Sequence, residues 1–161
     1  MKLDFIKTNL RAFTFENKRI RLWVENKCIG KTLNLFAGKT KLNINEYRVD
    51  IDSTFKPDVK MDAYEYIKGT NLKFDTILLD PPYSYRKGIE YYNGHYTSKF
   101  KLIADEIAKR KVQNVISFGY HTTFMGNKRG YELSELLVIG HSGAQHATIA
   151  IIEKAKSPNA D

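Results

Sequence analysis

The sequence predicts an α/β domain with a mainly parallel sheet that closes with an antiparallel hairpin strand. Short apolar runs typical of buried strands alternate with helical patterns along the chain. The last two predicted strands are joined by a glycine-containing turn. A chain of 161 residues with 42% hydrophobic content can bury one core. We therefore expect one domain over 1–161, with a basic helical region over 1–30 and a core over 31–155.

The first predicted elements are a helix and two short strands. Thr14 is expected to cap a helix that Gly30 terminates. Apolar residues predict a buried strand over 32–36, a tight turn over 37–40 and a second strand over 47–51. The gap between the turn and the second strand leaves room for one or two helical turns at most.

The later elements continue the alternation. They are a minor strand over 58–61, a helical turn over 63–68, a strand over 74–79, an amphipathic helix over 98–110, and strands over 112–117, 133–139 and 147–153. Polar loops over 84–96 and 119–130 separate some of them. Ligands of such sheets bind beyond the carboxyl ends of the strands. The turn over 36–40 and the segment 80–83 are both expected to face that cleft.

Charge and composition indicate the kind of partner. The net charge is +8, and residues 1–48 hold eleven Lys or Arg against four Asp or Glu. This asymmetry favours a nucleic-acid phosphate backbone as the partner, with a merely solvated basic surface as the alternative. The start of the chain lacks a signal-peptide pattern and no apolar run approaches the roughly 20 residues that span a bilayer, so we expect a cytoplasmic protein without membrane contact. Cys28 is the only cysteine, which excludes internal disulfides and multi-cysteine zinc sites.

The most specific motif is Asp80-Pro81-Pro82-Tyr83, at the end of the apolar strand over 74–79. The lone pair of an aromatic amine is delocalised into the ring and is a poor nucleophile. The Asp80 carboxylate and the Pro81 carbonyl can each accept an N–H and free that lone pair. The two prolines fix the backbone, and Tyr83 can stack on a base. The motif therefore predicts catalysis on the amine of a nucleobase.

This motif resembles the catalytic motif of the N6-adenine DNA methyltransferases, which belong to the class I methyltransferases. The resemblance implies a Rossmann-like fold, S-adenosylmethionine as cofactor and transfer to the N6 amine of a flipped adenine. It implies Asp80, Pro81, Pro82 and Tyr83 as catalytic residues. The implied cofactor-binding residues are Asn34, Leu35, Phe36, Ala37, Gly38, Asp50, Ile51, Asp62, Ala63 and Asp80. Asp52 is the alternative to Asp50, and Thr40 departs from the family, which has a second glycine there.

A tyrosine-rich basic loop follows the motif and is expected to contact the substrate. Its predicted binding residues are Tyr83, Tyr85, Arg86, Lys87, Tyr91, Tyr92 and His95. No segment is long enough for a separate recognition domain, so a partner subunit or a homodimer is expected to help select the target. His141 and His146 have no adjacent carboxylate or cysteine, and no metal site is expected.

Two alternatives remain open. DNA is favoured as the substrate by the form of the motif, whereas the small catalytic core suits RNA. The second alternative is a non-catalytic nucleic-acid-binding subunit of a methyltransferase pair. Thr40 and the short gap before residue 47 favour it, and the intact Asp80 and Tyr83 oppose it.

Overall fold

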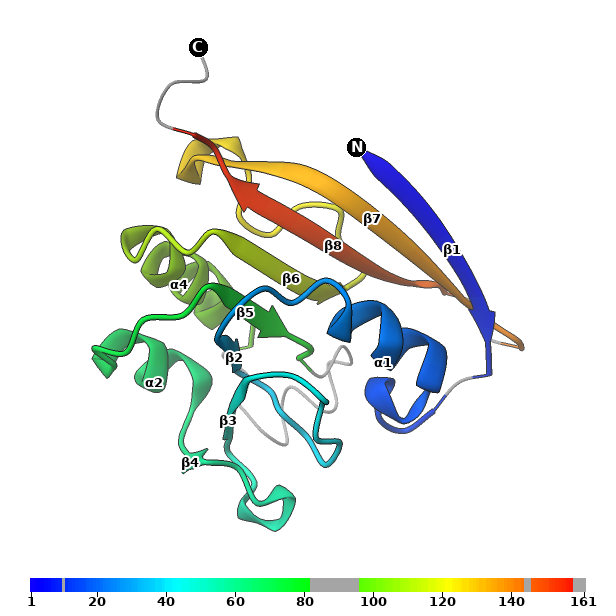
Figure 1. Cartoon of the computed structure of the whole chain (residues 1–161), viewed down its shortest axis with the longest axis horizontal. Helices are drawn as coiled ribbons and strands as arrows, with labels where there is room; N and C mark the ends of the chain where they lie inside the picture. Colours follow the sequence, from blue (N-terminus) through cyan, green and yellow to red (C-terminus); the bar gives the residue numbers. More distant parts are fainter. Residues whose placement is uncertain (10, 82–95, 144–145, 158–161) are drawn as a thin grey trace.

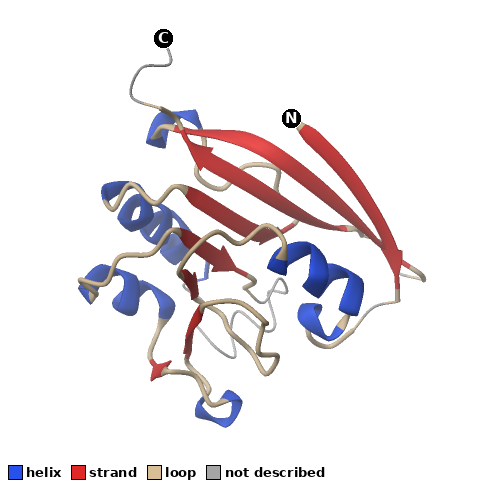
Figure 2. Ribbon diagram, in the orientation of Figure 1, coloured by secondary structure: helices blue, strands red, loops and turns tan. Residues whose placement is uncertain are grey.

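The computed structural model describes residues 1–9, 11–81, 96–143 and 146–157. These residues form one eight-stranded sheet in the order β1-β7-β8-β6-β5-β2-β3-β4, drawn as a twisted layer in Figure 2. The strands are β1 (Lys2–Thr8), β2 (Thr32–Asn34), β3 (Glu46–Asp50), β4 (Val59–Lys60), β5 (Thr76–Leu79), β6 (Asn114–Gly119), β7 (Tyr131–His141) and β8 (Thr148–Ala155). The helices are α1 (Lys18–Glu25), α2 (Ala63–Gly69) and α4 (Tyr96–Lys109), with 3-10 turns η1 (Thr14–Glu16), η2 (Ser53–Phe55) and η3 (Asn127–Arg129).

The strand directions confirm the predicted fold class. Seven strands run the same way, because β1 pairs in parallel with β7 and β4-β3-β2-β5-β6 is a continuous parallel run. The remaining strand, β8, is antiparallel to both β6 and β7. Along the chain the order moves outward from β2 to β4 and then returns to β5 on the other side of β2 (Figure 1). The boundary between β2 and β5 is therefore the switch point at which doubly wound sheets bind ligands.

Both faces of the sheet are packed. Ile77 of β5 joins a buried cluster with Ile67 of α2 and Ile103 of α4. Its neighbour Leu78 points to the opposite face and packs with Val24 of α1. This alternation along a strand with four buried residues is the pattern of a central strand covered on both sides.

The N-terminal region is not wholly helical, which corrects the prediction for residues 1–30. Its first residues form β1, an edge strand that pairs with β7 through Phe5 opposite Val138. Charged residues alternate with apolar ones here, so the segment lacks the continuous apolar run of a buried strand, and charges of this kind are common on sheet edges. The Phe5 ring lies over Gly140, where a Cβ atom would come within 3.2 Å of it.

The bounds of the first helix also differ from the prediction. Asn17, rather than Thr14, is its N-cap, because the Asn17 side chain accepts hydrogen bonds from the backbone N–H groups of Arg19 and Ile20. Thr14 instead begins η1. The helix ends at Glu25, well before Gly30. None of the helices in the described part of the chain is long and apolar enough to cross a membrane.

The connection from β2 to β3 contains no helix, in agreement with the short gap predicted from the sequence. A buried polar network holds it instead. The Glu46 carboxylate accepts hydrogen bonds from Asn34 Nδ2 at 2.8 Å and from the Leu42 N–H at 3.1 Å. Arg48 lies 3.7 Å from Glu46 in an ion pair. The connection is thereby fixed against the switch point without a crossover helix.

Candidate active site

The turn after β2 is hydrogen-bonded to both strands that flank β2, namely β5 and β3. The Leu35 N–H donates to the Leu78 carbonyl, and two residues later the Ala37 N–H donates to the Val49 carbonyl. Gly38 follows with a φ of +57°, a conformation that glycine adopts without strain. The predicted residues Phe36 to Gly38 therefore lie at the carboxyl edge of the sheet, as the sequence indicated.

Asp50 is held against this turn. Its Oδ2 accepts the Gly38 N–H at 2.8 Å and its Oδ1 accepts the Asp52 N–H at 2.9 Å. Each carboxylate oxygen has a further lone pair with which a ligand hydroxyl can be bound. Asp52 instead caps η2 by accepting from Thr54 N and Oγ1, and these hydrogen bonds lower the pKa of Asp52. The geometry thus favours Asp50 over Asp52 as a ligand-facing carboxylate.

Not every predicted cofactor residue has a side chain available at this turn. The buried Asn34 side chain is directed at Glu46 within the polar network. Ile51 lies beside Asp50 and is partly exposed. The Arg48 guanidinium donates a hydrogen bond to the Gly38 carbonyl.

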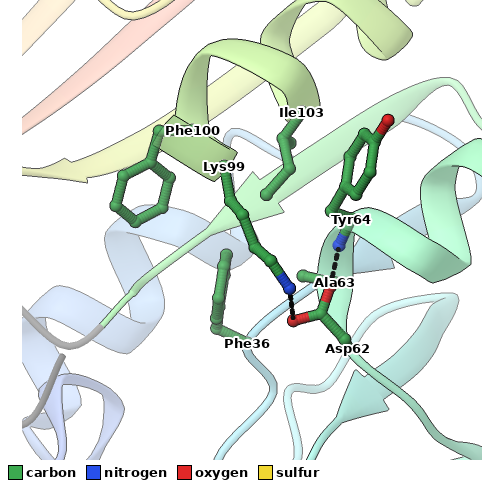
Figure 3. A pocket seen from close by; sticks show the side chains of 7 residues that line it. All are labelled: Phe36, Asp62, Ala63, Tyr64, Lys99, Phe100 and Ile103. Atoms are coloured by element: carbon green, nitrogen blue, oxygen red, sulfur yellow. Dashed lines mark hydrogen bonds and ion pairs between the residues drawn. The ribbon is translucent and has the colours of Figure 1, made fainter. Parts of the chain in front are cut away.

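Asp62 and Ala63 meet Phe36 in a small pocket, which α4 closes from the other side (Figure 3). Asp62 is the N-cap of α2, since its Oδ1 accepts the N–H groups of Tyr64 and Glu65 at 3.0 and 3.2 Å. The pocket holds about 10 Å³, room for one water molecule. The structure therefore brings these three predicted residues together.

Lys99 of α4 occupies the mouth of this pocket. Its Nζ lies 3.0 Å from Asp62 Oδ2, and Figure 3 shows the side chain reaching past Phe36 to Asp62. The two rings are 6.1 Å apart. The apolar walls suit a flat aromatic group such as adenine, but such a group fits only when the Lys99 and Phe100 side chains turn aside.

The predicted catalytic motif begins where β5 ends. Asp80 is half-buried and Pro81 is buried at the carboxyl end of this strand. The other two catalytic predictions, Pro82 and Tyr83, lie outside the described residues, as do Tyr85, Arg86, Lys87, Tyr91, Tyr92 and His95. The predicted role of that loop in substrate binding therefore stays a prediction.

A larger cavity of about 550 Å³ opens beside Pro81. Leu79, Pro81, Phe100, Lys101, Ser117, Phe118, Gly119, Tyr120, His121, Thr123, Phe124 and Arg129 line it. Residues 117–129 were predicted only as a strand end and a loop. Their position directly after a buried strand that neighbours β5 is the signal that could have assigned them to the site.

The basic N-terminal region divides into paired and exposed charges. Lys27 forms an ion pair with Glu135 at 2.7 Å and is mostly buried. Arg19 and Arg21 each donate one hydrogen bond to a backbone carbonyl. Lys18 and Arg19 are exposed at the start of α1, and these two carry charge to the surface.

No metal-binding cluster of three or more His, Cys, Asp or Glu is present among the described residues. His141 Nε2 lies 2.9 Å from Thr148 Oγ1, which gives this histidine a structural partner in the closing hairpin. The His146 ring lies 6.1 Å from the Tyr120 ring.

No family model and no curated protein matches the sequence. Solved structures do resemble it. N-methyltransferase NodS from Bradyrhizobium japonicum WM9 has a TM-score of 0.61 at 10% identity, over 92% of this chain and 100% of that chain. The putative methyltransferase yhhF from Escherichia coli has a TM-score of 0.59 at 13% identity, over 92% and 90%. The chain has the class I methyltransferase fold.

A third match shows how this fold can be part of a larger protein. TrmN from Thermus thermophilus has a TM-score of 0.58 at 13% identity, over 85% of this chain and 47% of that chain. The chain therefore spans about half the length of TrmN. Within the class I methyltransferase fold seen here, the Gly38 turn and Asp80 stand on either side of the switch point.

Proposed function

We propose that the protein transfers a methyl group from S-adenosylmethionine to the exocyclic N6 amine of adenine in DNA. The observation that carries the proposal is the position of Asp80 and Pro81 in a methyltransferase fold. They follow β5 at the switch point, and Pro81 lines the cavity of about 550 Å³. Pro81 thus lines a site large enough for a base, and Asp80 directly precedes it in the chain.

The cofactor would lie across the carboxyl ends of β2 and β3. Asp50 is placed to accept hydroxyl groups of a ribose, in charge-assisted hydrogen bonds. Phe36, Asp62 and Ala63 would hold the adenine ring once Lys99 leaves the pocket. S-adenosylmethionine would supply an electrophilic methyl group on a sulfonium centre.

The residues after β5 would act on the target amine. The Asp80 carboxylate and the Pro81 carbonyl accept its two N–H groups, which withdraws the lone pair from the ring and directs it at the methyl group. The Asp80 charge would also stabilise the positive charge that develops on the nitrogen as the methyl group leaves the sulfonium sulfur. The methylated amine would then lose one proton to solvent, with S-adenosylhomocysteine as the second product. Because proline fixes the backbone, both acceptors are oriented before the base arrives.

The cavity beside Pro81 would receive the base. Phe100 and Phe124 provide aromatic and apolar walls of the kind on which bases stack. A base inside a duplex cannot reach this position, so the target must be flipped out or single-stranded. Lys18 and Arg19, at the start of α1, supply positive charge for the phosphate backbone.

The choice of DNA rests on the form of the motif, and adenine in RNA is the alternative substrate. A partner subunit or a second copy of the chain would supply the target recognition. A non-catalytic nucleic-acid-binding subunit is the second candidate. The observation that favours it is the narrow pocket at Asp62, which Lys99 occupies.

The deciding experiment incubates the protein with labelled S-adenosylmethionine and separate DNA and RNA pools, followed by nucleoside analysis. N6-methyladenine is the expected product. Asp80→Ala should lower activity by on the order of a hundredfold or more, because it removes the acceptor that stabilises charge on the amine. Asp75→Asn is the matched control at the opposite end of β5, where Asp75 accepts the Lys31 N–H. A different methylated nucleoside, or full activity in Asp80→Ala, would overturn the proposal.

A further inference from the structure

The carboxyl end of β6 carries a polar pair inside the cavity next to Pro81. The Ser117 side chain is buried, and its Oγ lies 3.3 Å from His121 Nε2. Both residues line the cavity, together with apolar and aromatic residues such as Leu79, Phe100 and Phe124. In an apolar binding site, a small number of convergent polar groups sets the orientation of the ligand. The pair is therefore the part of the cavity wall best suited to orient a bound ring.

Gly119 makes room for this arrangement. A Cβ atom at this position would lie 2.6 Å from His121 Cε1 and 2.7 Å from His121 Nδ1. Such distances are too short for any side chain to be tolerated without moving the imidazole. The requirement for glycine is steric, because the His121 ring lies directly over the backbone at the end of the strand.

The loop beyond His121 is fixed by a buried carboxylate. Glu153 of β8 is only 1% exposed and accepts the N–H groups of Phe124, Met125 and Gly126 at 2.8–3.0 Å. The Phe124 ring in turn lies 6.1 Å from the His121 ring. The imidazole is thus held on one side by Ser117 and on the other by a loop that is itself fastened to the sheet.

The charge state of His121 suits hydrogen bonding to an uncharged base. Burial lowers the pKa of His121, and the nearby Glu153 opposes this effect only in part. Lys101 of α4 and Arg129 of η3, which is paired with Asp105, also line the cavity. At neutral pH the ring is therefore uncharged, with one nitrogen that donates and one that accepts.

We propose that Ser117 and His121 form the polar edge of the target-base site, where they hydrogen-bond a ring nitrogen of the base and hold its amine at Asp80. This inference rests on the proposed function. The amine uses its two N–H groups at Asp80 and Pro81, so the remaining polar atoms beside it are ring nitrogens, which in adenine are acceptors. Either the Ser117 hydroxyl or the His121 imidazole can donate a hydrogen bond to such an acceptor. The ligand class is a flat base in which an amine adjoins an unprotonated ring nitrogen.

The test measures methylation of a single-stranded oligonucleotide that contains one adenine, with the full chain. His121→Ala should lower kcat/KM tenfold or more and leave cofactor affinity unchanged, whereas His121→Asn should regain part of the loss by supplying an amide donor. Gly119→Ala keeps the histidine but displaces it, and should reproduce the effect of His121→Ala. The matched control is His141→Asn, because His141 bonds Thr148 outside the cavity lining.

Base analogues separate a contact with the base from a general structural effect. Oligonucleotides with 1-deazaadenine or 7-deazaadenine each lack one ring nitrogen. The wild-type protein should discriminate against one of them, and His121→Ala should lose that discrimination. A merely structural histidine would lower activity on all three bases equally.

The pH profile is a second readout. In the wild type, activity should fall as the pH drops through the lowered pKa of His121, below 6.5, because the imidazolium no longer accepts a hydrogen bond and repels the positive charge on the amine. That acid limb should be absent in His121→Asn and present in His141→Asn. If the wild type methylates adenine but His121→Ala keeps both its rate and its discrimination, this inference fails and the proposed function stands. If the wild type methylates neither DNA nor RNA, both fail.

Discussion

Arg48 is predicted to be the residue on which the cofactor turn most depends. Its guanidinium is 7% exposed and donates to the carbonyls of Gly38, Phe55 and Lys56. It also neutralises Glu46, whose side chain is fully buried. Arg48→Met retains much of the apolar stem but removes every donor. Three carbonyls and one carboxylate lose a partner in the same step.

The expected loss of stability is about 3–5 kcal/mol, the range for breaking a buried ion pair by removing one member. For a domain of this size, that corresponds to a decrease in Tm of roughly 6–20 °C. A typical domain is stable by about 5–15 kcal/mol, so the variant should still fold at low temperature. Cofactor affinity should fall as well, because the Gly38 carbonyl loses its anchor.

The pH dependence of the loss identifies its cause. Burial raises the pKa of Glu46, and Arg48 opposes this shift. Without Arg48 the folded-state pKa of Glu46 should rise further above its ordinary value of 4.5. The free-energy cost of burying the charged Glu46 carboxylate is present at pH values above that raised pKa. It is relieved as the pH falls toward 4.5, because the carboxylate then takes up a proton. The difference in stability between variant and wild type should therefore shrink on acidification.

Urea unfolding at several pH values measures this difference. Arg21→Met is the matched control, since Arg21 is less buried and donates one hydrogen bond, to the Phe15 carbonyl at 3.3 Å. It should cost about 1 kcal/mol or less. Equal losses in Arg48→Met and Arg21→Met, or a loss that does not vary with pH, would refute the reasoning.

Other predictions concern the pocket, the cysteine and the basic surface. Lys99→Met should raise S-adenosylmethionine affinity by up to about fivefold on calorimetry, because an ion pair with Asp62 worth roughly 0.2–1 kcal/mol no longer has to be broken; weaker binding would mean that Lys99 itself holds the ligand. Burial raises the pKa of Cys28 to about 11, so iodoacetamide at pH 8 should label it slowly in the native protein and rapidly in urea. Mass spectrometry measures the labelling, and fast labelling of the native protein would contradict this prediction. Neutralising Lys18 and Arg19 should flatten the plot of log affinity against log salt by about 0.9 per lost duplex-DNA contact, and an unchanged slope would leave them as solvated charges.

The elements that the sequence predicted well are those with a local signal. The central strands β5 and β6 are rich in buried apolar residues, and α4 repeats apolar residues at helical spacing. The strand β1 was not predicted, although charged and apolar residues alternate over its first residues, which is a local pattern of a half-exposed strand. Its pairing with β7 decides between this pattern and a helix.

The candidate site was predicted in part for the same reason. Phe36, Asp62 and Ala63 come together because each follows or caps an element whose position in the sheet order brings it to one edge. The approach of His121 to Ser117 was not predictable, since it depends on the path of the chain after β6. From the sequence alone, Arg48 is likewise expected to be a solvent-exposed charge, and only the fold shows that it is buried.

The absence of a crossover helix changes what the turn after β2 can do. The Gly38 N–H is bound by Asp50, and the Gly38 carbonyl is bound by Arg48. Both polar groups of this residue are therefore used within the chain, and glycine is needed for its positive φ rather than for space, since a Cβ atom there would meet only Phe13 at an ordinary 3.5 Å. In the proposed cofactor site, the contribution expected of a turn tied in this way is to fix the Asp50 carboxylate at the carboxyl end of β3. Thr40 in place of a second glycine is consistent with that role, because the backbone beyond Gly38 is not required to approach the ligand closely.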